Sequence, residues 1–222
     1  MIRKADEMRN GEKDSGESSS RRERLLETGF RLFAAHSIEA VKLQEVATAS
    51  GVGIATLYRY FENKPNLVIE IGTRKWIEYH DYVEAEYRRR GGETMTAAEN
   101  LEFYLDCYIE LYRNHKDLLV FNRNFDTYVK HEGCTKEQMA PYNEAVSAYA
   151  KRFHKLYQKA KEDGTLDIRI SERKLFINTM YIMLSVAGKY AEGLIYPMDY
   201  KQDMMEELIM LKNMILDTYA VK

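Results

Sequence analysis

Apolar residues recur every three or four positions along most of the chain, which is the spacing of helices with one buried face. The first clear stripe contains Leu26, Phe30 and Phe33 and ends near His36. Glycine, proline and asparagine divide the remaining pattern into separate segments. The pattern predicts an all-α protein of about nine helices, at residues 20–36, 43–50, 54–61, 63–90, 94–114, 116–131, 136–162, 172–190 and 199–219.

The N-terminal residues lack this periodicity. They are polar, carry both charges and end in three serines, so we expect a disordered arm over residues 1–19. Ser20 and Glu23 have the spacing of a capping box, which predicts the start of the first helix. The sequence therefore divides into this arm, a domain of short helices at residues 20–66 and a larger helical domain at residues 67–222.

The stretch VKLQEVATASGVGIATLYRYFENKPNL, residues 41–67, contains two short predicted helices joined by a glycine-rich turn. In a helix-turn-helix the two helices cross steeply, so the crossing needs a small side chain and the turn needs an unusual backbone conformation. Ala47 and Gly51 meet these demands. The apolar positions expected to form one small core are Leu43, Val46, Val52, Leu57 and Phe61.

The opposite face of the second short helix can then enter a major groove of DNA. Arg59 can donate two hydrogen bonds to a guanine, Thr56 can bond a base edge or a phosphate, and Ile54 or Ala55 can contact a thymine methyl group. Other residues would hold phosphates on either side. The alternative is a three-helix packing unit that never meets DNA. The predicted DNA-binding residues are Lys42, Ile54, Ala55, Thr56, Tyr58, Arg59, Tyr60 and Lys64.

Three features of this stretch resemble the DNA-binding signature of the tetracycline-repressor (TetR) family in order and spacing. They are the Ala-x-x-x-Gly-Val turn, the run from Thr56 to Phe61, and Lys64-x-x-Leu67. The family usually has Thr at the position of Lys42 and Ser at that of Gly53, where the hydroxyls cap the two short helices. The resemblance implies a homodimeric regulator, with an effector pocket among the fifth to seventh helices and a dimer interface on the last two.

The residues on those later helices agree with a pocket. Seventeen tyrosines are many for this length, and each buried phenol needs a hydrogen-bond partner that a ligand or water can supply. The alternative is that most of these rings are core or surface. Asp106, Glu110 and Asp126 would suit a cationic or planar aromatic effector. The candidate pocket residues are Tyr104, Tyr108, Tyr112, Phe121, Phe125, Tyr128, Tyr149 and Phe153.

The last two predicted helices carry more apolar surface than one covered side requires. A second copy of the chain would cover the excess, and paired DNA-binding heads about one DNA turn apart would bind an inverted repeat. The candidate dimer-interface residues are Ile182, Val186, Lys189, Leu208, Leu211 and Ile215.

The charge distribution fits this organisation. Residues 21–75 contain nine Lys or Arg and six Asp or Glu, a net charge of +3, whereas residues 76–222 contain twenty and twenty-four, a net charge of −4. The longest apolar stretch, residues 175–187, is shorter than the ~20 residues of a membrane span, and the N-terminus lacks a signal-peptide core. We therefore expect a cytoplasmic protein whose Cys107 and Cys134 are reduced thiols, with a redox role as the alternative.

Enzyme classes find no support in the sequence. It contains no phosphate-binding glycine loop and no supported Ser-His-Asp order, and its five histidines lack ligand spacing. His131 and Cys134 are three residues apart, but Gly133 between them favours a helix end over a metal site. We therefore expect neither metal nor cofactor.

The sequence thus predicts a repressor that a small-molecule effector releases from a palindromic operator. The first alternative is a DNA-bound structural, nucleoid-organising protein of the same fold without an effector. The second is a purely helical interaction protein.

Overall fold

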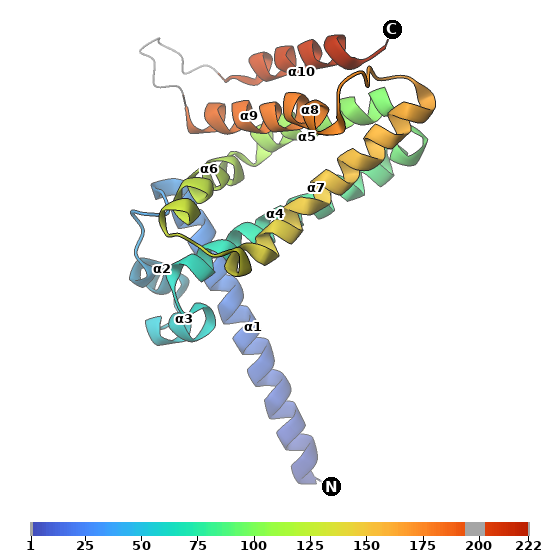
Figure 1. The fold of residues 1–222 in the computed structure, drawn as a ribbon. Helices are drawn as coiled ribbons and strands as arrows, with labels where there is room; N and C mark the ends of the chain where they lie inside the picture. Colours follow the sequence, from blue (N-terminus) through green and yellow to red (C-terminus); the bar gives the residue numbers. More distant parts are fainter. Residues whose placement is uncertain (1, 194–202, 222) are drawn as a thin grey trace. The chain divides into compact units, whose positions relative to one another are not determined.

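The computed structural model describes residues 2–193 and 203–221, with side chains from residue 18 onward. This part of the chain is helical with no β-strand, so the all-α prediction is confirmed (Figure 1). A π-helical segment, Ile177–Tyr181, makes α8 and α9 one continuous helix, which gives nine helices in the described part. The bounds are α1 Ile2–His36, α2 Leu43–Ser50, α3 Ile54–Phe61, α4 Lys64–Arg89, α5 Ala97–Asn114, α6 Lys116–His131, α7 Lys136–Asp163, α8 Glu172–Phe176, α9 Ile182–Glu192 and α10 Met205–Tyr219.

The first helix differs from its prediction. It begins at Ile2, so residues 2–19 are helical where we expected a disordered arm, and Ser20 lies inside the helix instead of capping it. The physical reason is that the segment before Ser20 is rich in Lys, Glu, Arg and Met and contains no proline, so it can continue a helix that packs further along. The predicted start of the last helix at Asp199 and the break at Pro197 lie outside the described residues.

The chain forms two compact units. The first comprises the described residues up to Gly72 together with Asn124–Met139, and the second comprises Thr73–Arg123 and the described residues from Ala140 onward. The boundary therefore lies within α4, later than the predicted boundary between residues 66 and 67. The start of α4 belongs to the first unit because its apolar residues, among them Leu67 and Ile71, are buried there.

The first unit contains a small core between α1, α2 and α3, which lie side by side in Figure 1. Phe30 and Phe33 from α1 and Val46 from α2 are buried in this core. Leu57 and Phe61 of α3 are also buried. Burial of these five side chains holds the two short helices in place, because neither is long enough to be stable alone.

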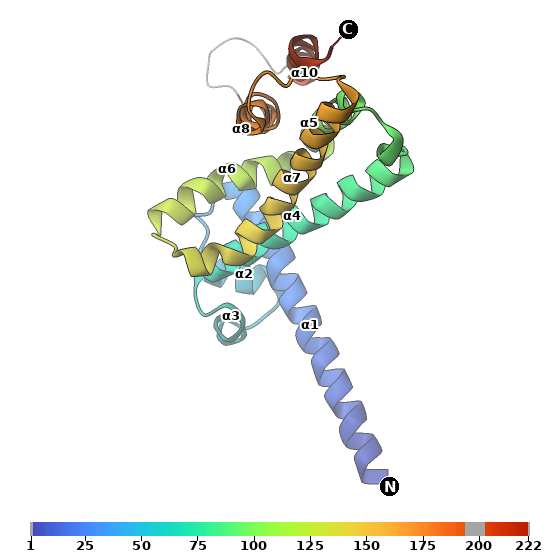
Figure 2. The same cartoon turned by 45° about the vertical axis from the view of Figure 1, so that its right-hand side comes forward.

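In the second unit α5 packs against α9 and α10, and the helix formed by α8 and α9 runs alongside α10 (Figures 1 and 2). The start of α5 is set by a capping box between Thr96 and Glu99, slightly later than the predicted start at Thr94. Within the described ranges, no helix combines the length and apolar character that crossing a bilayer demands.

Candidate functional site

The turn between α2 and α3 has the geometry that the sequence predicts. Gly51 ends α2 in the left-handed conformation, with φ 67° and ψ 27°. The Val52 N–H donates to the Ala47 carbonyl at 3.0 Å, and Ala47 itself is fully buried at the crossing. Lys42 and Gly53 occupy the N-cap positions of α2 and α3, and neither supplies a side-chain cap. The ends of the two helices at this turn are therefore held by backbone hydrogen bonds without a side-chain cap.

The predicted groove-facing residues of α3 share one side of the helix. Leu57 and Phe61 point into the core, whereas Ala55, Tyr58 and Arg59 are exposed. The other predicted residues on α3 are half-buried, namely Ile54, Thr56 and Tyr60. Lys42, which precedes α2, is exposed. This exposed surface of α3, with Tyr58 and Arg59 at its centre, is called the α3 surface below.

Tyr60 and Lys64, both predicted to hold phosphates, are engaged with other groups of the chain. The Tyr60 hydroxyl lies 2.8 Å from the Ser18 Oγ, and this hydrogen bond lowers the pKa of Tyr60. Lys64 Nζ donates to the Glu39 carbonyl at 3.3 Å and lies over the Tyr128 ring, so burial lowers the pKa of Lys64. Lys64 has two further N–H donors for a phosphate, whereas the Tyr60 hydroxyl already interacts with Ser18.

Asn63 caps α4, as the sequence predicts. Its side-chain oxygen accepts a hydrogen bond from the Asn66 N–H at 2.9 Å. The first turn of α4 therefore starts directly after α3, and the helix runs on without a break to Arg89. Its N-terminal residues lie in the first unit and its later residues in the second.

The second unit contains an apolar cavity with about 410 Å³ of space free of protein atoms, part of it open to solvent. Pairs of residues four apart on α4, α5, α7 and the helix after Ser171 supply most of its lining. Four of the eight predicted pocket residues line it, namely Tyr104, Tyr108, Tyr149 and Phe153. The other lining residues are Tyr79, Val83, Cys107, Arg152, Phe176 and Met180.

The remaining predicted pocket residues do not line this cavity. Tyr112 and Phe121 are buried elsewhere in the second unit, and the Tyr112 hydroxyl accepts from the Met204 N–H at 3.2 Å. Phe125 and Tyr128 belong to the first unit, because α6 is divided between the two. A local signal for the missed residues exists in the sequence, since Tyr79 and Val83, like Phe176 and Met180, have the spacing of one helix face.

Most polar groups that line the cavity are uncharged at neutral pH. Burial raises the pKa of Cys107 to about 12, and it raises the pKa of Tyr104 and Tyr108 above the ordinary value for tyrosine. Burial also raises the pKa of Tyr149. Among the lining residues that the structure describes, Arg152 alone carries a charge.

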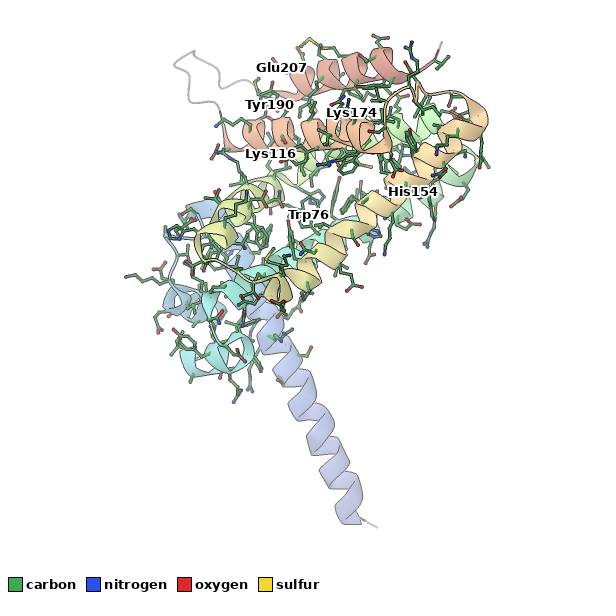
Figure 3. All side chains as sticks on the ribbon, in the orientation of Figure 1. Trp76, Lys116, His154, Lys174, Tyr190 and Glu207 are labelled. Carbon is green, nitrogen blue, oxygen red and sulfur yellow. The ribbon has the colours of Figure 1, made fainter. Side chains whose placement is uncertain are left out.

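A hydrogen-bonded layer supports one side of the cavity. Trp76, labelled in Figure 3, donates its indole N–H to Asn122 Oδ1 at 3.0 Å, and the same oxygen accepts from the Tyr142 hydroxyl at 3.0 Å. The Trp76 ring meets the Tyr149 ring edge to face at 5.6 Å between centroids. Tyr149 is therefore held from behind by a ring that is itself fixed in orientation.

The carboxylates proposed from the sequence to bind a cationic effector lie away from the cavity. Asp106 accepts from Lys212 Nζ at 2.8 Å, and Glu110 pairs with Arg113 at 3.3 Å. Neither lines the cavity, and Asp126 is a residue of the first unit. The structure therefore removes the charge pattern on which the expectation of a cationic effector depended.

The predicted dimer-interface residues separate into two groups. Leu208 and Ile215 are buried within the chain's own second unit because α10 covers α5, so the prediction was wrong for these two. Ile182 is 37% exposed, whereas the other three are half-buried, namely Val186, Lys189 and Leu211. The exposed apolar side chains of this region are Ile177, Tyr181, Ile182, Ile209, Met210 and Met214.

Comparison with solved structures identifies the fold. The chain superposes on a transcriptional regulator from Saccharomonospora viridis in complex with choline with a TM-score of 0.71, at 18% identity, over 92% of this chain and 100% of that one. FadR from Bacillus subtilis in complex with stearoyl-CoA gives a TM-score of 0.67 at 16% identity, over 87% of this chain and 96% of that one.

Residues 25–71 match the family model described as bacterial regulatory proteins, tetR family. The transcriptional repressor KstR2 of Mycobacterium tuberculosis is 25% identical over 108 residues, which are 48% of this chain and 52% of that protein. The chain spans between 35% and 54% of the length of the curated relatives that it matches. Residues 25–71 therefore match the N-terminal domain of the tetR family, and the chain as a whole shares the fold of the regulators named above.

Proposed function

We propose that this chain is a homodimeric repressor that binds a palindromic operator through the α3 surface and is released by a small molecule in the apolar cavity. The observation that carries the proposal is the α3 surface itself. It presents Arg59 and Tyr58 to solvent on a helix whose other face is anchored by Leu57 and Phe61. A helix held in this way can enter a major groove without rearranging the core behind it.

Operator binding can be tested with fluorescently labelled duplexes from the promoter region beside the gene, by fluorescence anisotropy at several salt concentrations. Arg59→Ala is expected to weaken operator binding by about tenfold to a hundredfold, the effect of losing one good bidentate base contact. Lys151→Ala, which removes an exposed cation on α7, is the matched control and should leave binding unchanged. Equal binding by wild type and Arg59→Ala would contradict the role of the α3 surface.

Release by a small molecule is supported by the cavity and by the continuity of α4. Tyr79 and Val83 line the cavity, and the same unbroken helix begins at Lys64, directly after α3. A ligand that displaces the cavity-lining turns of α4 can therefore change the position of its first turn. The similar proteins solved with stearoyl-CoA and with choline are complexes with small molecules, which supports a ligand in this chain as well.

The test of release is operator binding in the presence of candidate effectors. Val83→Trp should fill the cavity, so its operator complex is expected to resist a compound that dissociates the wild-type complex. The exposed Ile77→Trp on the same helix is the control for adding an indole ring. The ligand part of the proposal fails if no compound that binds the chain alters operator affinity.

Dimerisation is supported by the exposed apolar side chains on α9 and α10. Met210 and Met214 are 59% and 57% exposed and lie one helical turn apart, beyond the buried Leu208 stripe. Met214→Glu is expected to shift the chain towards monomer in sedimentation velocity at micromolar concentration. Ile77→Glu, which charges an exposed apolar position on α4, is the control, and an unchanged dimer for Met214→Glu would refute this surface.

A further inference from the structure

Arg152 has one nitrogen for which the described residues provide no acceptor. Its Nη2 donates to the His80 carbonyl at 3.0 Å and lies 3.2 Å from Glu84 Oε2. Its Nη1 is buried and has no hydrogen-bond partner. The side chain is only 12% exposed, so solvent reaches little of it. A buried guanidinium donor without an acceptor is costly, and it favours a site that an acceptor completes.

Tyr149 provides a second unsatisfied donor beside it. Its hydroxyl is buried and has no partner among the residues that the structure describes, and Tyr149 lies on α7 one helical turn before Arg152. The Arg152 guanidinium carbon is 5.8 Å from the centroid of the Tyr149 ring, and both residues line the cavity. Two donors without acceptors therefore belong to neighbouring side chains that line the same cavity.

The rest of the lining is apolar or aromatic. Val83, Phe153, Phe176 and Met180 provide aliphatic, aromatic and thioether surface, and the buried tyrosines and Cys107 add uncharged walls. An occupant must therefore combine an apolar body with a single polar end.

An adjoining groove shows where the polar end would lie. Tyr104 and Arg152 line both the cavity and this groove, which also contains two lysines and three glutamates, namely Lys155, Lys159, Glu84, Glu93 and Glu162. Arg152 therefore stands where the apolar cavity meets a polar path to solvent. A ligand with its body in the cavity would place its polar end at Arg152.

We propose that the cavity binds a monocarboxylate with an aromatic or apolar body, and that Arg152 Nη1 and the Tyr149 hydroxyl donate hydrogen bonds to the carboxylate. This inference rests on the proposed function of the cavity as the effector site and names the chemical class of the effector. A carboxylate offers two acceptor oxygens and the charge opposite to that of the guanidinium, so it satisfies both donors at once. The cavity lining offers a cation no carboxylate, and the nearby Glu84 carboxylate is already paired with Arg152.

The test uses three probes with one carbon skeleton, namely cinnamate, cinnamamide and cinnamylamine. Isothermal titration calorimetry on the full chain should show cinnamate binding at least about tenfold more tightly than the neutral amide or the protonated amine, as expected for charge-assisted hydrogen bonds. Arg152→Met should weaken cinnamate to the level of cinnamamide and leave cinnamamide within about twofold. A loss of the preference for cinnamate over cinnamamide would show that Arg152 recognises the charge. A purely structural role of Arg152 would leave the ratio of the two affinities unchanged.

Tyr149→Phe removes only the hydroxyl and should weaken cinnamate by about threefold to tenfold with little change for the amide. Lys151→Met is the matched control, because it removes an exposed cation from the same helix. It should leave all three affinities unchanged. If Arg152→Met unfolds the chain, Tyr149→Phe and the three probes on the wild type still decide the question.

The proposal is overturned if wild type binds cinnamamide or cinnamylamine as tightly as cinnamate, if it binds none of the three, or if Arg152→Met weakens all three equally. These outcomes leave the proposed repressor function standing, since operator binding by the α3 surface is measured separately. Loss of operator binding with cinnamate selectivity intact would instead refute the repressor function and retain the carboxylate site.

Discussion

Gly51 and Gly53 lie on either side of Val52 in the turn between α2 and α3, and substitution by serine should have opposite effects at the two positions. Gly51 has φ 67°, in the left-handed region, whereas Gly53 has φ −63° and ψ 141°, which any residue adopts. A Cβ added at either glycine meets no atom within 4 Å. Backbone conformation, and not space, therefore determines the sign of each effect.

The magnitudes follow from that difference. Serine at position 51 would adopt the left-handed conformation at a cost of about 1–2 kcal/mol. The lower conformational entropy of the unfolded chain offsets about 0.4–1 kcal/mol of this cost, so we expect Gly51→Ser to lower the free energy of unfolding by about 1 kcal/mol. Gly53→Ser has no such strain, gains the same unfolded-state effect and places a hydroxyl at the uncapped N-terminus of α3, worth a few tenths of a kcal/mol. We expect a net gain of about 0.5–1 kcal/mol.

Hydrogen–deuterium exchange measured by mass spectrometry on peptides from α2 and α3 reads these local stabilities directly. A loss near 1 kcal/mol corresponds to exchange about fivefold faster for Gly51→Ser, and Gly53→Ser should slow exchange by about twofold to fivefold. A peptide from α7 is the internal control and should not change. The reasoning fails if the two variants shift exchange in the same direction, or if Gly51→Ser leaves it unchanged.

Three further predictions concern the second unit. Gly92→Ala should destabilise the chain by about 1–3 kcal/mol in urea unfolding, because an added Cβ would overlap the Tyr87 ring, whose hydroxyl donates to the Gly92 carbonyl at 2.7 Å. Burial raises the pKa of Cys107 to about 12, so Cys107 should react with a disulfide reagent at pH 8 far more slowly than Cys134. The reaction can be followed by absorbance, and the two rates should become equal when the chain is unfolded. Desolvation raises the pKa of Asp163, but hydrogen bonds from backbone N–H groups outweigh it and hold the pKa below 3.8, so its stabilisation is present above about pH 4 and lost as pH falls. Urea unfolding at pH 7 and pH 3 should therefore differ less for Asp163→Asn than for wild type.

The helices were predictable from sequence wherever a local signal marks their ends. The segment Lys116–His131 has the predicted bounds because junction residues flank it on both sides. The capping-box pattern is less decisive: it sets the start of α5 at Thr96 but not the start of α1 at Ser20, although both serine or threonine residues precede a glutamate by three. The difference lies upstream, since helix-forming residues before Ser20 allow the helix to continue through the pattern.

The two parts of the candidate site differ in how much of them the sequence contains. The α3 surface is built from one short stretch, so its small residue, its turn and its outward face all follow from local spacing. The cavity draws on four helices far apart in sequence, and its residues share a site only after tertiary packing. Aromatic content on α5 and α7 identified Tyr104 and Tyr149, but no local pattern places Phe125 in the other unit.

Charge shows most clearly why the effector class needed the structure. Asp106 stands among aromatic residues in the sequence, yet it pairs with Lys212 on α10, which also pairs with Glu102, and it does not line the cavity. The sequence alone suggests that Arg152 is an exposed cation on the surface of α7. In the folded chain its side chain is buried, and its Nη1 has no acceptor among the described residues. The ligand that a cavity binds depends on the donors and charges in its lining that have no partner within the chain. A count of charged residues near aromatic residues in the sequence cannot distinguish such unpaired groups from paired ones. The partners of Asp106 and Arg152 therefore change the expected charge of the effector from positive to negative.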